Sequence, residues 1–346
     1  MFNHSLYMSR CVQLAQNGLG NTYPNPLVGS VIVHDNSIIG EGWHQKAGEA
    51  HAEVCAINSV KQVELLEKST LYVNLEPCSH FGKTPPCADL IIEKKIPRVV
   101  IGCVDPNHRV AGRGIEKLIS AGCEVVSGVL EEEAIKLNRR FFTFHQKKRP
   151  YIILKWAVSE DGFIAPQNQL SGQPFWITNK LSQQLVHLWR TQEQAILVGT
   201  HTVIKDNPKL DARLVSGNNP IRVVIDRDLK IDKNFHVYSG QVKTIFITEK
   251  NPPISDENLK YEPADFGKEL VSQILEILYK HQIQSVIIEG GAETLQHFIN
   301  ANIWDEARVF TGAVIIQKGI RQPDFYFSPQ EEKIIGSDTL RIYYKS

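Results

Sequence analysis

The 346-residue sequence has no excess of charge of either sign and no long apolar run. Its 38 lysines and arginines balance its 38 aspartates and glutamates, so no strong field of one sign favours nucleic acid or a membrane surface as partner. No apolar stretch reaches the roughly 18 residues of a membrane-spanning helix. The first residues also lack the basic-then-apolar order of a secretory signal. These absences predict a cytoplasmic protein without nucleic-acid or membrane partners.

Cysteine is absent after residue 123, and all six cysteines lie within the first 123 residues. In a reducing compartment a cluster of cysteine and histidine indicates a metal site more often than a disulfide. Cys78 and Cys87 belong to such a cluster. Free cysteines in apolar surroundings behave as small hydrophobic residues. The remaining four are therefore expected to be buried: Cys11, Cys55, Cys103 and Cys123.

The length of the chain predicts two domains. A polar segment at 145–150 ends in proline and marks a boundary, which gives predicted domains over 1–146 and 147–346. In both halves apolar runs alternate with helical patterns, and this alternation is typical of α/β layered sheets. Strands are expected over 28–34, 71–75, 98–104, 123–126, 151–158, 195–198, 221–225, 244–248, 285–289 and 307–316. Helices are expected over 51–60, 88–95, 112–122, 131–144, 180–190 and 268–280.

The first half carries a set of residues suited to a catalytic zinc. His51 and Glu53 form the motif His-x-Glu. Further along the chain, Pro77 directly precedes Cys78, and Cys87 follows as the second cysteine of the set. This order is the pattern of zinc nucleobase deaminases, except that eight residues separate the cysteines where the general pattern has two. Catalytic zinc sites use three protein ligands and leave the fourth position to water, which zinc activates at neutral pH. We therefore expect one zinc ion on His51, Cys78 and Cys87, with Glu53 as the catalytic proton shuttle.

An alternative is a structural zinc site closed by a fourth protein ligand. His44 and His80 are the candidates for that ligand. In that case the first half would be a non-enzymatic interaction module. Another alternative is a nucleoside or nucleic-acid deaminase with an accessory domain, although the balanced charge and the long segment between the cysteines disfavour it.

Longer motifs around these residues resemble one family. They are Pro-Asn-Pro-Leu-Val-Gly at 24–29, Gly-Trp-His at 42–44, and Pro-Cys-Ser-His-Phe-Gly-Lys-Thr-Pro-Pro-Cys at 77–87. Asp-Pro-Asn at 105–107 and Val-Ala-Gly-Arg-Gly-Ile at 110–115 follow. Together they resemble the bifunctional deaminase–reductases of riboflavin biosynthesis, over nearly the whole chain. The resemblance implies a cytidine-deaminase-like three-layer α/β/α domain followed by a dihydrofolate-reductase-like α/β domain.

The resemblance also implies the first reaction. The small-molecule substrate would be 2,5-diamino-6-ribosylamino-4(3H)-pyrimidinone 5′-phosphate, which would lose its 2-amino group as ammonia to a zinc-activated hydroxide. Glu53 would protonate the ring nitrogen and assist departure of the amine. Four further residues would line the substrate pocket: Asn25, His44, His80 and Lys83.

In the second half the residues alone are less informative. Strand 285–289 leads to Gly290-Gly291 and a helix, a turn whose exposed amides can cradle phosphate or can be purely structural. The G-x-G-x-x-G fingerprint of dinucleotide-binding sites is absent there.

Other motifs of the second half resemble the reductase domain of the same family. They are Lys155-Trp156-Ala157, Ser159-x-Asp161-Gly162, Trp176-Ile177-Thr178, Thr202-Val203, Asp206-Asn207-Pro208, Leu210 with Arg213, and Glu289-Gly290-Gly291. The resemblance implies NADPH as the cofactor that reduces the ribosyl group to a ribityl chain, giving 5-amino-6-ribitylamino-uracil 5′-phosphate.

The resemblance assigns two sets of contacts and an oligomeric state. It implies a homo-oligomer, dimer or tetramer. The expected NADP contacts are Ala157, Trp176, Thr202, Asp206, Gly291, Ala292, Glu293, Thr294, Leu295, Gln296 and His297. The expected reductase substrate contacts are Arg190, Leu210, Arg213 and Glu289, the arginines being suited to phosphate. Three positions depart from the family pattern: Pro174, Arg227 and Ala313.

Overall fold

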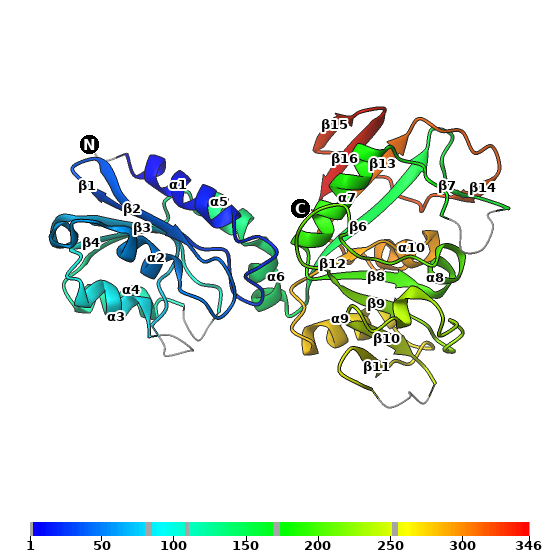
Figure 1. Cartoon of the computed structure of the whole chain (residues 1–346), viewed down its shortest axis with the longest axis horizontal. Helices are drawn as coiled ribbons and strands as arrows, with labels where there is room; N and C mark the ends of the chain where they lie inside the picture. Colours follow the sequence, from blue (N-terminus) through cyan, green and yellow to red (C-terminus); the bar gives the residue numbers. More distant parts are fainter. Residues whose placement is uncertain (1–2, 80–84, 108–110, 169–173, 251–254, 346) are drawn as a thin grey trace. The chain divides into compact units, whose positions relative to one another are not determined.

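The computed structural model describes residues 3–79, 85–107, 111–168, 174–250 and 255–345. The chain divides into two compact units, Met1–Lys148 and Arg149–Ser346 (Figure 1). Within the described ranges, no helix combines the length and the apolar character needed to span a membrane.

The first unit is a five-stranded sheet between two layers of helices. The strand order is β2-β1-β3-β4-β5, with β1 antiparallel to β2 and β3, and with β3, β4 and β5 parallel. Helices α1 and α5 pack on one face, and α2, α3 and α4 lie on the other (Figure 1). The elements are α1 His4–Gln16, β1 Gly29–His34, β2 Ser37–Trp43, α2 Ala52–Ser59, η1 Val63–Lys68, β3 Thr70–Leu75, α3 Cys87–Glu93, β4 Arg98–Cys103, α4 Arg113–Ser120, β5 Glu124–Ser127, α5 Glu131–Leu137 and α6 Arg139–Lys147.

The second unit has a nine-stranded sheet with the order β11-β10-β9-β8-β12-β6-β13-β16-β15. The strands from β11 to β13 are parallel, whereas β16 and β15 continue the sheet antiparallel. Strands β7 and β14 pair in a separate ribbon. The strands are β6 Tyr151–Ser159, β7 Phe163–Pro166, β8 Ala195–Gly199, β9 Ile221–Ile225, β10 Thr244–Thr248, β11 Leu259–Pro263, β12 Ser285–Ile288, β13 Glu306–Gly312, β14 Gly319–Arg321, β15 Glu331–Ile335 and β16 Asp338–Tyr344.

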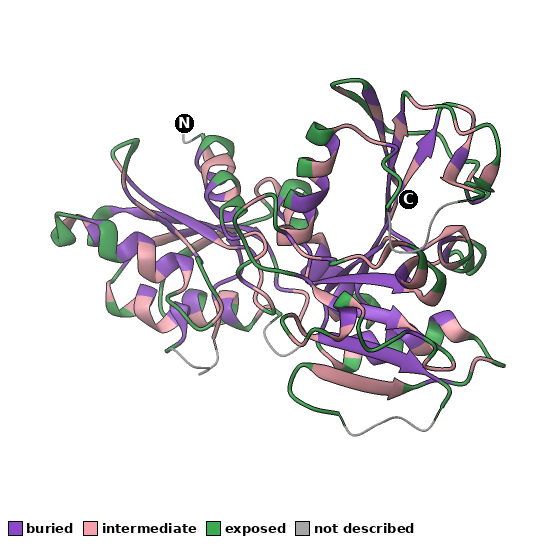
Figure 2. Ribbon diagram, turned by 45° about the vertical axis from the view of Figure 1, so that its right-hand side comes forward, coloured by how far each residue is buried: buried purple, intermediate pink, exposed green. Residues whose placement is uncertain are grey.

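Both faces of this sheet are covered by apolar packing. One core joins the strands to α9 and α10 around Phe298 and Trp304, and the other joins them to α7 and α8 around Trp189 and Phe246. Buried residues accordingly run along the central strands of both units (Figure 2). The helices are α7 Lys180–Gln192, α8 Thr200–Asp206, η2 His236–Tyr238, α9 Leu270–Lys280 and α10 Ala292–Asn300.

The predicted α/β architecture is confirmed, and most predicted elements end within two residues of the observed ones. The helical stretch predicted over 131–144 is confirmed except at Asn138, which divides it into α5 and α6. The Asn138 side chain accepts a hydrogen bond from Leu27 N at 2.7 Å and donates to Leu27 O at 2.9 Å. The strand predicted over 307–316 ends at Gly312. Two cysteines expected to be buried, Cys55 and Cys123, are partly exposed.

Candidate functional site

The three predicted zinc ligands come together at one edge of the first unit's sheet. His51 is the residue before α2, and Cys87 begins α3. Cys78 lies in the segment that follows β3. The ligand atoms of these three residues lie within 4.8 Å of one another.

The donor set and its spacing fit zinc. His51 Nδ1 lies 3.2 Å from Cys87 Sγ and 3.6 Å from Cys78 Sγ. Tetrahedral zinc, with Zn–N near 2.0 Å and Zn–S near 2.3 Å, sets its N and S ligand atoms about 3.5 Å apart. The Cys87 thiol and backbone N–H both donate to Cys78 Sγ, which lowers the pKa of Cys78 and raises that of Cys87. A thiolate that collects hydrogen bonds at a helix start is prepared to bind a cation.

Glu53 lies in the first turn of α2, two residues after His51. Its side chain is buried, with 3% exposed, and burial raises the pKa of Glu53 to about 7. The neighbouring charge of Cys78 acts in the same direction. A carboxyl group with a pKa near neutrality can both take and return a proton. This placement suits the predicted proton shuttle.

His44 and Asn25 form a hydrogen-bonded pair beside the ligands. His44 Nδ1 donates to the carbonyl oxygen of Ala50 at 3.0 Å, so Nε2 is the acceptor for Asn25 Nδ2 at 3.1 Å. The His44 ring meets the His51 ring edge-on at 5.5 Å, and burial lowers the pKa of His44. Both ring nitrogens of His44 are thus occupied, which disfavours His44 as a fourth metal ligand. The other two predicted pocket residues, His80 and Lys83, lie outside the described residues.

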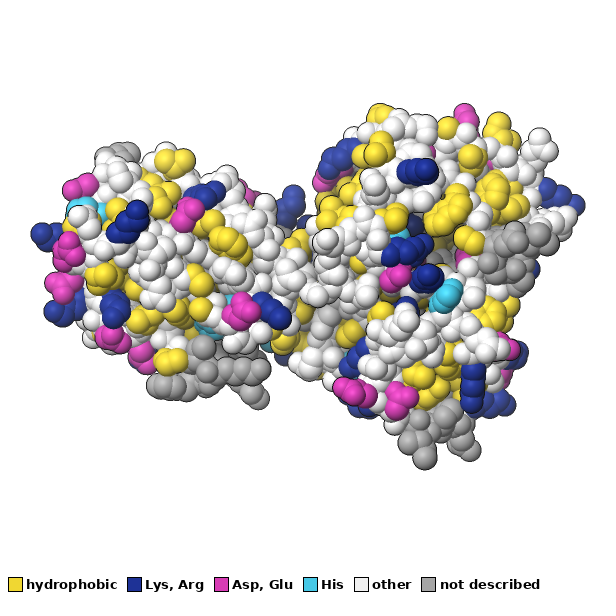
Figure 3. All heavy atoms as spheres, viewed as in Figure 1, with side chains coloured by type: hydrophobic (Ala, Val, Ile, Leu, Met, Phe, Trp, Pro, Cys, Tyr) yellow, Lys and Arg dark blue, Asp and Glu magenta, His cyan; other side chains and the backbone are white. Residues whose placement is uncertain are grey.

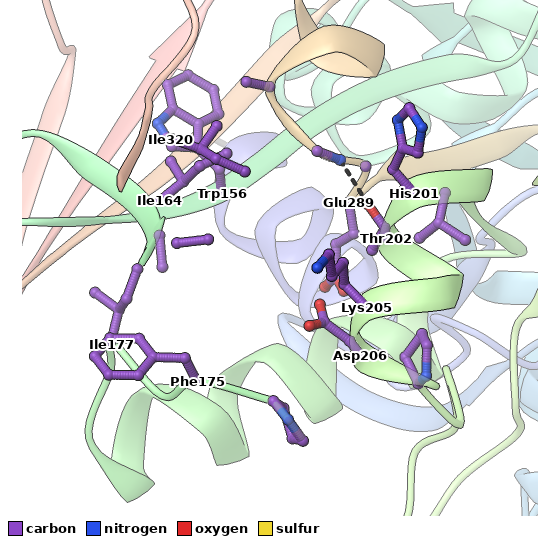
Figure 4. A pocket seen from close by; sticks show the side chains of 18 of the residues that line it. Trp156, Ile164, Phe175, Ile177, His201, Thr202, Lys205, Asp206, Glu289 and Ile320 are labelled. Atoms are coloured by element: carbon purple, nitrogen blue, oxygen red, sulfur yellow. Dashed lines mark hydrogen bonds between the residues drawn. The ribbon is translucent and has the colours of Figure 1, made fainter. Parts of the chain in front are cut away.

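The second unit contains a cavity of about 350 Å³, a size typical of ligand sites. Around a hollow on the face of this unit, cationic, acidic and histidine side chains gather beside hydrophobic ones (Figure 3). One wall of the cavity is apolar, with Trp156, Ile164, Phe175, Ile177 and Ile320 (Figure 4). The opposite wall is polar and comes largely from α8, with His201, Thr202, Lys205 and Asp206. This division suits a ligand that has a flat apolar ring and charged groups.

Three charged side chains with little exposure, between 10% and 16%, lie in the cavity wall. Glu289, at the end of β12, accepts a hydrogen bond from Arg190 Nη2 at 2.8 Å and pairs with Lys155 Nζ at 3.6 Å. Burial favours a raised pKa for Glu289, but the two cations outweigh it and lower the pKa to about 2. Burial lowers the pKa of Lys155. The carboxylate is therefore charged at neutral pH and is balanced by two cations.

The turn after β12 is tied to α8. The hydroxyl of Thr202 accepts a hydrogen bond from Gly291 N at 2.9 Å (Figure 4). A Cβ atom at Gly290 would lie 2.6 Å from Thr294 Cβ, so only glycine fits there. The backbone at 290–292 thus reaches the cavity with no large side chain in front of it.

The structure places nine of the fifteen predicted reductase contacts at the cavity. The nine are Ala157, Trp176, Arg190, Thr202, Asp206, Leu210, Glu289, Gly291 and Ala292. The other six are not among its lining residues. Leu295 is fully buried in the core, Thr294 packs against Gly290 and Gly199, and Gln296 accepts from Asp324 N at 2.7 Å. Three residues remain. Glu293 pairs with the exposed His201, and Arg213 pairs with Asp211. His297 lies in the last turn of α10.

Two lysines that line the cavity, Lys155 and Lys205, were not predicted as site residues, although their side chains can bind anionic groups. Lys155 was visible within the Lys-Trp-Ala motif, where a cation inside an otherwise apolar strand was the available signal. Of the three departures from the family pattern, Pro174 lines the cavity, whereas Arg227 is exposed and pairs with Glu249 at 2.7 Å. Ala313 directly follows β13.

Comparison with known proteins covers both units. Residues 1–103 match the model of the cytidine and deoxycytidylate deaminase zinc-binding region, and residues 150–323 match that of the RibD C-terminal domain. The riboflavin biosynthesis protein RibD of Aquifex aeolicus is 40% identical over 338 residues, covering 95% of this chain and 92% of that protein. RibD of Escherichia coli is 37% identical, covering 91% of this chain and 89% of that protein.

Two solved structures are similar to this chain over 99% of its length. The diaminohydroxyphosphoribosylaminopyrimidine deaminase/5-amino-6-(5-phosphoribosylamino)uracil reductase of Thermotoga maritima superposes with a TM-score of 0.89 at 39% identity, covering 99% of both chains. RibD of Acinetobacter baumannii gives 0.87 at 31% identity, covering 99% of this chain and 98% of that one. The chain therefore belongs to the RibD family, the bifunctional deaminases and reductases of riboflavin biosynthesis.

Proposed function

We propose that residues 1–146 deaminate 2,5-diamino-6-ribosylamino-4(3H)-pyrimidinone 5′-phosphate, and that residues 147–346 then reduce its ribosyl group with NADPH. The observation that carries the first step is the convergence of His51, Cys78 and Cys87, within 4.8 Å, beside the buried carboxyl group of Glu53. Cytidine deaminases share the zinc-binding region but act without a reductase. The second unit and its cavity favour the two-step reaction.

In the deamination, His51, Cys78 and Cys87 hold zinc. The bound ion supplies Lewis acidity, which makes water a nucleophile at neutral pH. Glu53 takes one proton from the attacking water and delivers it to the ring nitrogen; it then takes the proton of the hydroxyl formed on the ring carbon and delivers it to the departing amine. Its raised pKa suits both transfers, because the same group must accept and donate near neutral pH.

Asn25, His44, His80 and Lys83 form the substrate pocket in this proposal. Asn25 uses its side-chain Nδ2 to donate to His44 Nε2. Its side-chain oxygen, Oδ1, is left to accept a hydrogen bond from a donor on the pyrimidine. Lys83, with His80, supplies donors for the ribose phosphate. The long segment between the two cysteines thus sets the preference for a phosphorylated pyrimidine.

In the reduction, the cavity of the second unit holds NADPH, which supplies the hydride. Trp176 and Ala157, which line the cavity, would receive the nicotinamide, and the amides at 290–292 with Thr202 and Asp206 would bind the phosphates and ribose. The cofactor contacts expected in α10 do not line the cavity and stay predictions: Glu293, Thr294, Leu295, Gln296 and His297.

Arg190, Leu210, Arg213 and Glu289 contact the reductase substrate in this proposal. Arg190 is held by Glu289 and also donates to the carbonyl oxygen of Asp211 at 3.1 Å. A guanidinium fixed in this way keeps its direction and can bind phosphate without losing much side-chain entropy.

Incubating the full chain with the pyrimidine phosphate and NADPH tests both steps. Ammonia release followed by loss of NADPH absorbance is the expected course. Removing zinc with a chelator should stop ammonia release, whereas oxidation of NADPH by the deaminated pyrimidine should continue. Ammonia release from cytidine or RNA instead would indicate a nucleoside or nucleic-acid deaminase and contradict the proposal.

We propose also that the enzyme is a cytoplasmic homo-oligomer, a dimer or tetramer. The balanced charge and the family membership support this assignment. Light scattering at micromolar concentration tests it, and a mass near 39.1 kDa would contradict it.

A further inference from the structure

Glu76 begins the segment that leads from β3 to the ligand Cys78, and it is only 4% exposed. Its carboxylate gathers four backbone N–H groups. Oε1 accepts from Gly114 N at 2.8 Å and Ile115 N at 3.4 Å. Oε2 accepts from Gly112 N at 3.0 Å and Asp105 N at 3.3 Å. A buried carboxylate is thus satisfied by backbone donors that lie far away in sequence.

These donors show that Glu76 caps α4 from another element. A helix usually receives its cap from the side chain just before it, which accepts from the second or third N–H of the helix. In α4 that preceding residue is Gly112, which has a φ of +78° and no side chain. Glu76 accepts from Gly114 and Ile115, the second and third residues of α4, and so takes the place of the missing cap.

The first turn of α4 also lies directly on Pro77. A Cβ atom at Gly114 would lie 2.1 Å from the carbonyl oxygen of Pro77. The backbone of Glu76 is held as well, because its N–H donates to Cys103 O at 3.0 Å. Proline has a fixed φ, so the direction of the chain into Cys78 follows from how Glu76 and Pro77 are held.

Cys78 depends on this arrangement more than the other ligands do. His51 and Cys87 stand at the starts of α2 and α3, whose packing fixes them. Cys78 lies outside a helix or strand and follows Pro77 immediately. We propose that Glu76 is a positioning residue that sets Cys78 for zinc by tying the segment 76–78 to the start of α4. This inference rests on the proposed zinc role of His51, Cys78 and Cys87.

A carboxylate is required because all four partners are donors. Glutamine at position 76 keeps one acceptor oxygen, but its NH₂ group would face two N–H groups. It also removes the negative charge that a helix start favours. Changes in residues that orient metal ligands typically weaken metal binding by about 10- to 100-fold, and we expect Glu76→Gln to weaken zinc binding by at least about tenfold.

The experiment uses the full-length protein and has two readouts. Zinc affinity is measured by competition with a chromophoric chelator, and the thiolate ligands are followed in the cobalt(II) absorption spectrum. The variants are Glu76→Gln and Gly114→Ala, the second of which displaces the α4 turn from Pro77 without changing charge. Leu118→Ala is the matched control, because Leu118 is a fully buried α4 residue that makes none of these contacts with Glu76. Reductase turnover should be unchanged in all three.

The inference is supported if Glu76→Gln and Gly114→Ala bind zinc more weakly and shift the thiolate–cobalt band. Leu118→Ala should change neither property. If Glu76→Gln does not fold, Gly114→Ala carries the test alone. Wild-type affinity and spectrum in the folded variants, or an equal loss in Leu118→Ala, would overturn it. Failure of the wild-type protein to bind zinc would instead overturn the proposed metal site.

Discussion

Arg190 donates a charge-assisted hydrogen bond to Glu289, 2.8 Å from Nη2 to Oε2, in the wall of the cavity of the second unit. Lys155 adds a second cation 3.6 Å from the other carboxylate oxygen. Removing one member of a buried ion pair costs more than the pair itself contributes, because the remaining charge is left buried. The three side chains therefore act as one unit, and a change at one of them should affect stability as well as substrate binding.

The depressed pKa of Glu289 makes the stability of the second unit depend on pH. Its pKa is about 2 in the folded chain, against about 4.3 for an unperturbed glutamate. The folded state thus binds this proton less readily than the unfolded state. The contribution is fully present above about pH 4.3 and is lost as pH falls towards 2. A shift of this size corresponds to about 3 kcal/mol.

This contribution can be measured by urea unfolding of the wild type and Glu289→Gln at several pH values between 6 and 3. Tryptophan fluorescence reports the unfolding. The variant should be less stable at pH 6, and the difference should shrink towards pH 3. Glu249→Gln is the control, because the pair of Glu249 with Arg227 is largely exposed and contributes little. A constant difference between wild type and Glu289→Gln across this range would contradict the assignment.

Glu53→Ala should separate metal binding from catalysis. We expect the variant to keep one zinc per chain, because the three ligands are intact, and to lose ammonia release by about 10²- to 10⁴-fold, the usual contribution of a general acid–base. Metal analysis and the ammonia assay measure the two effects. Glu64→Ala, which removes an exposed carboxylate from η1, should keep full activity. Loss of zinc from Glu53→Ala would make Glu53 a ligand.

NADPH should bind the full-length protein more tightly than NADH. The additional 2′-phosphate of NADPH offers charge-assisted hydrogen bonds that NADH lacks. Calorimetric titrations with the two cofactors at the same ionic strength provide the comparison. Addition of salt should narrow the difference, because screening weakens contacts between exposed charges. Equal affinities would refute NADPH as the preferred cofactor.

The zinc site could be predicted because its signal is local. His51 and Glu53 are two residues apart, and Cys78 directly follows Pro77, as in the H-x-E and P-C pattern of zinc nucleobase deaminases. The pairing of Asn25 with His44 could not be foreseen in the same way, since it depends on how the loop before β1 meets the end of β2. The capping of α4 by Glu76 is hidden for the same reason, because its partners lie up to 39 residues further along the chain.

The position of the expected α10 contacts away from the cavity also has a physical cause. Residues 294–297 were expected to contact the cofactor because the family resemblance assigns the whole segment 291–297 to it. They form part of α10, however, and successive helix residues point about 100° apart, so they cannot all face one cavity. Leu295 faces the core instead, and Gln296 binds the backbone of Asp324. The short, largely exposed strand β15 had too little apolar alternation to be predicted.

Thr202 offers a test of how the 290–292 turn is held for the cofactor. Its hydroxyl accepts the hydrogen bond from Gly291 N, and valine has nearly the same shape without that acceptor. A lost hydrogen bond of this kind costs about 1 kcal/mol, so Thr202→Val should weaken NADPH binding by about fivefold. Thr202→Ser retains the hydroxyl and is the matched control, expected to bind within about twofold of the wild type. Titration of each full-length variant gives the two dissociation constants. If Thr202→Val binds NADPH as tightly as the wild type, the hydroxyl does not hold the turn for the cofactor, because valine lacks only that hydroxyl.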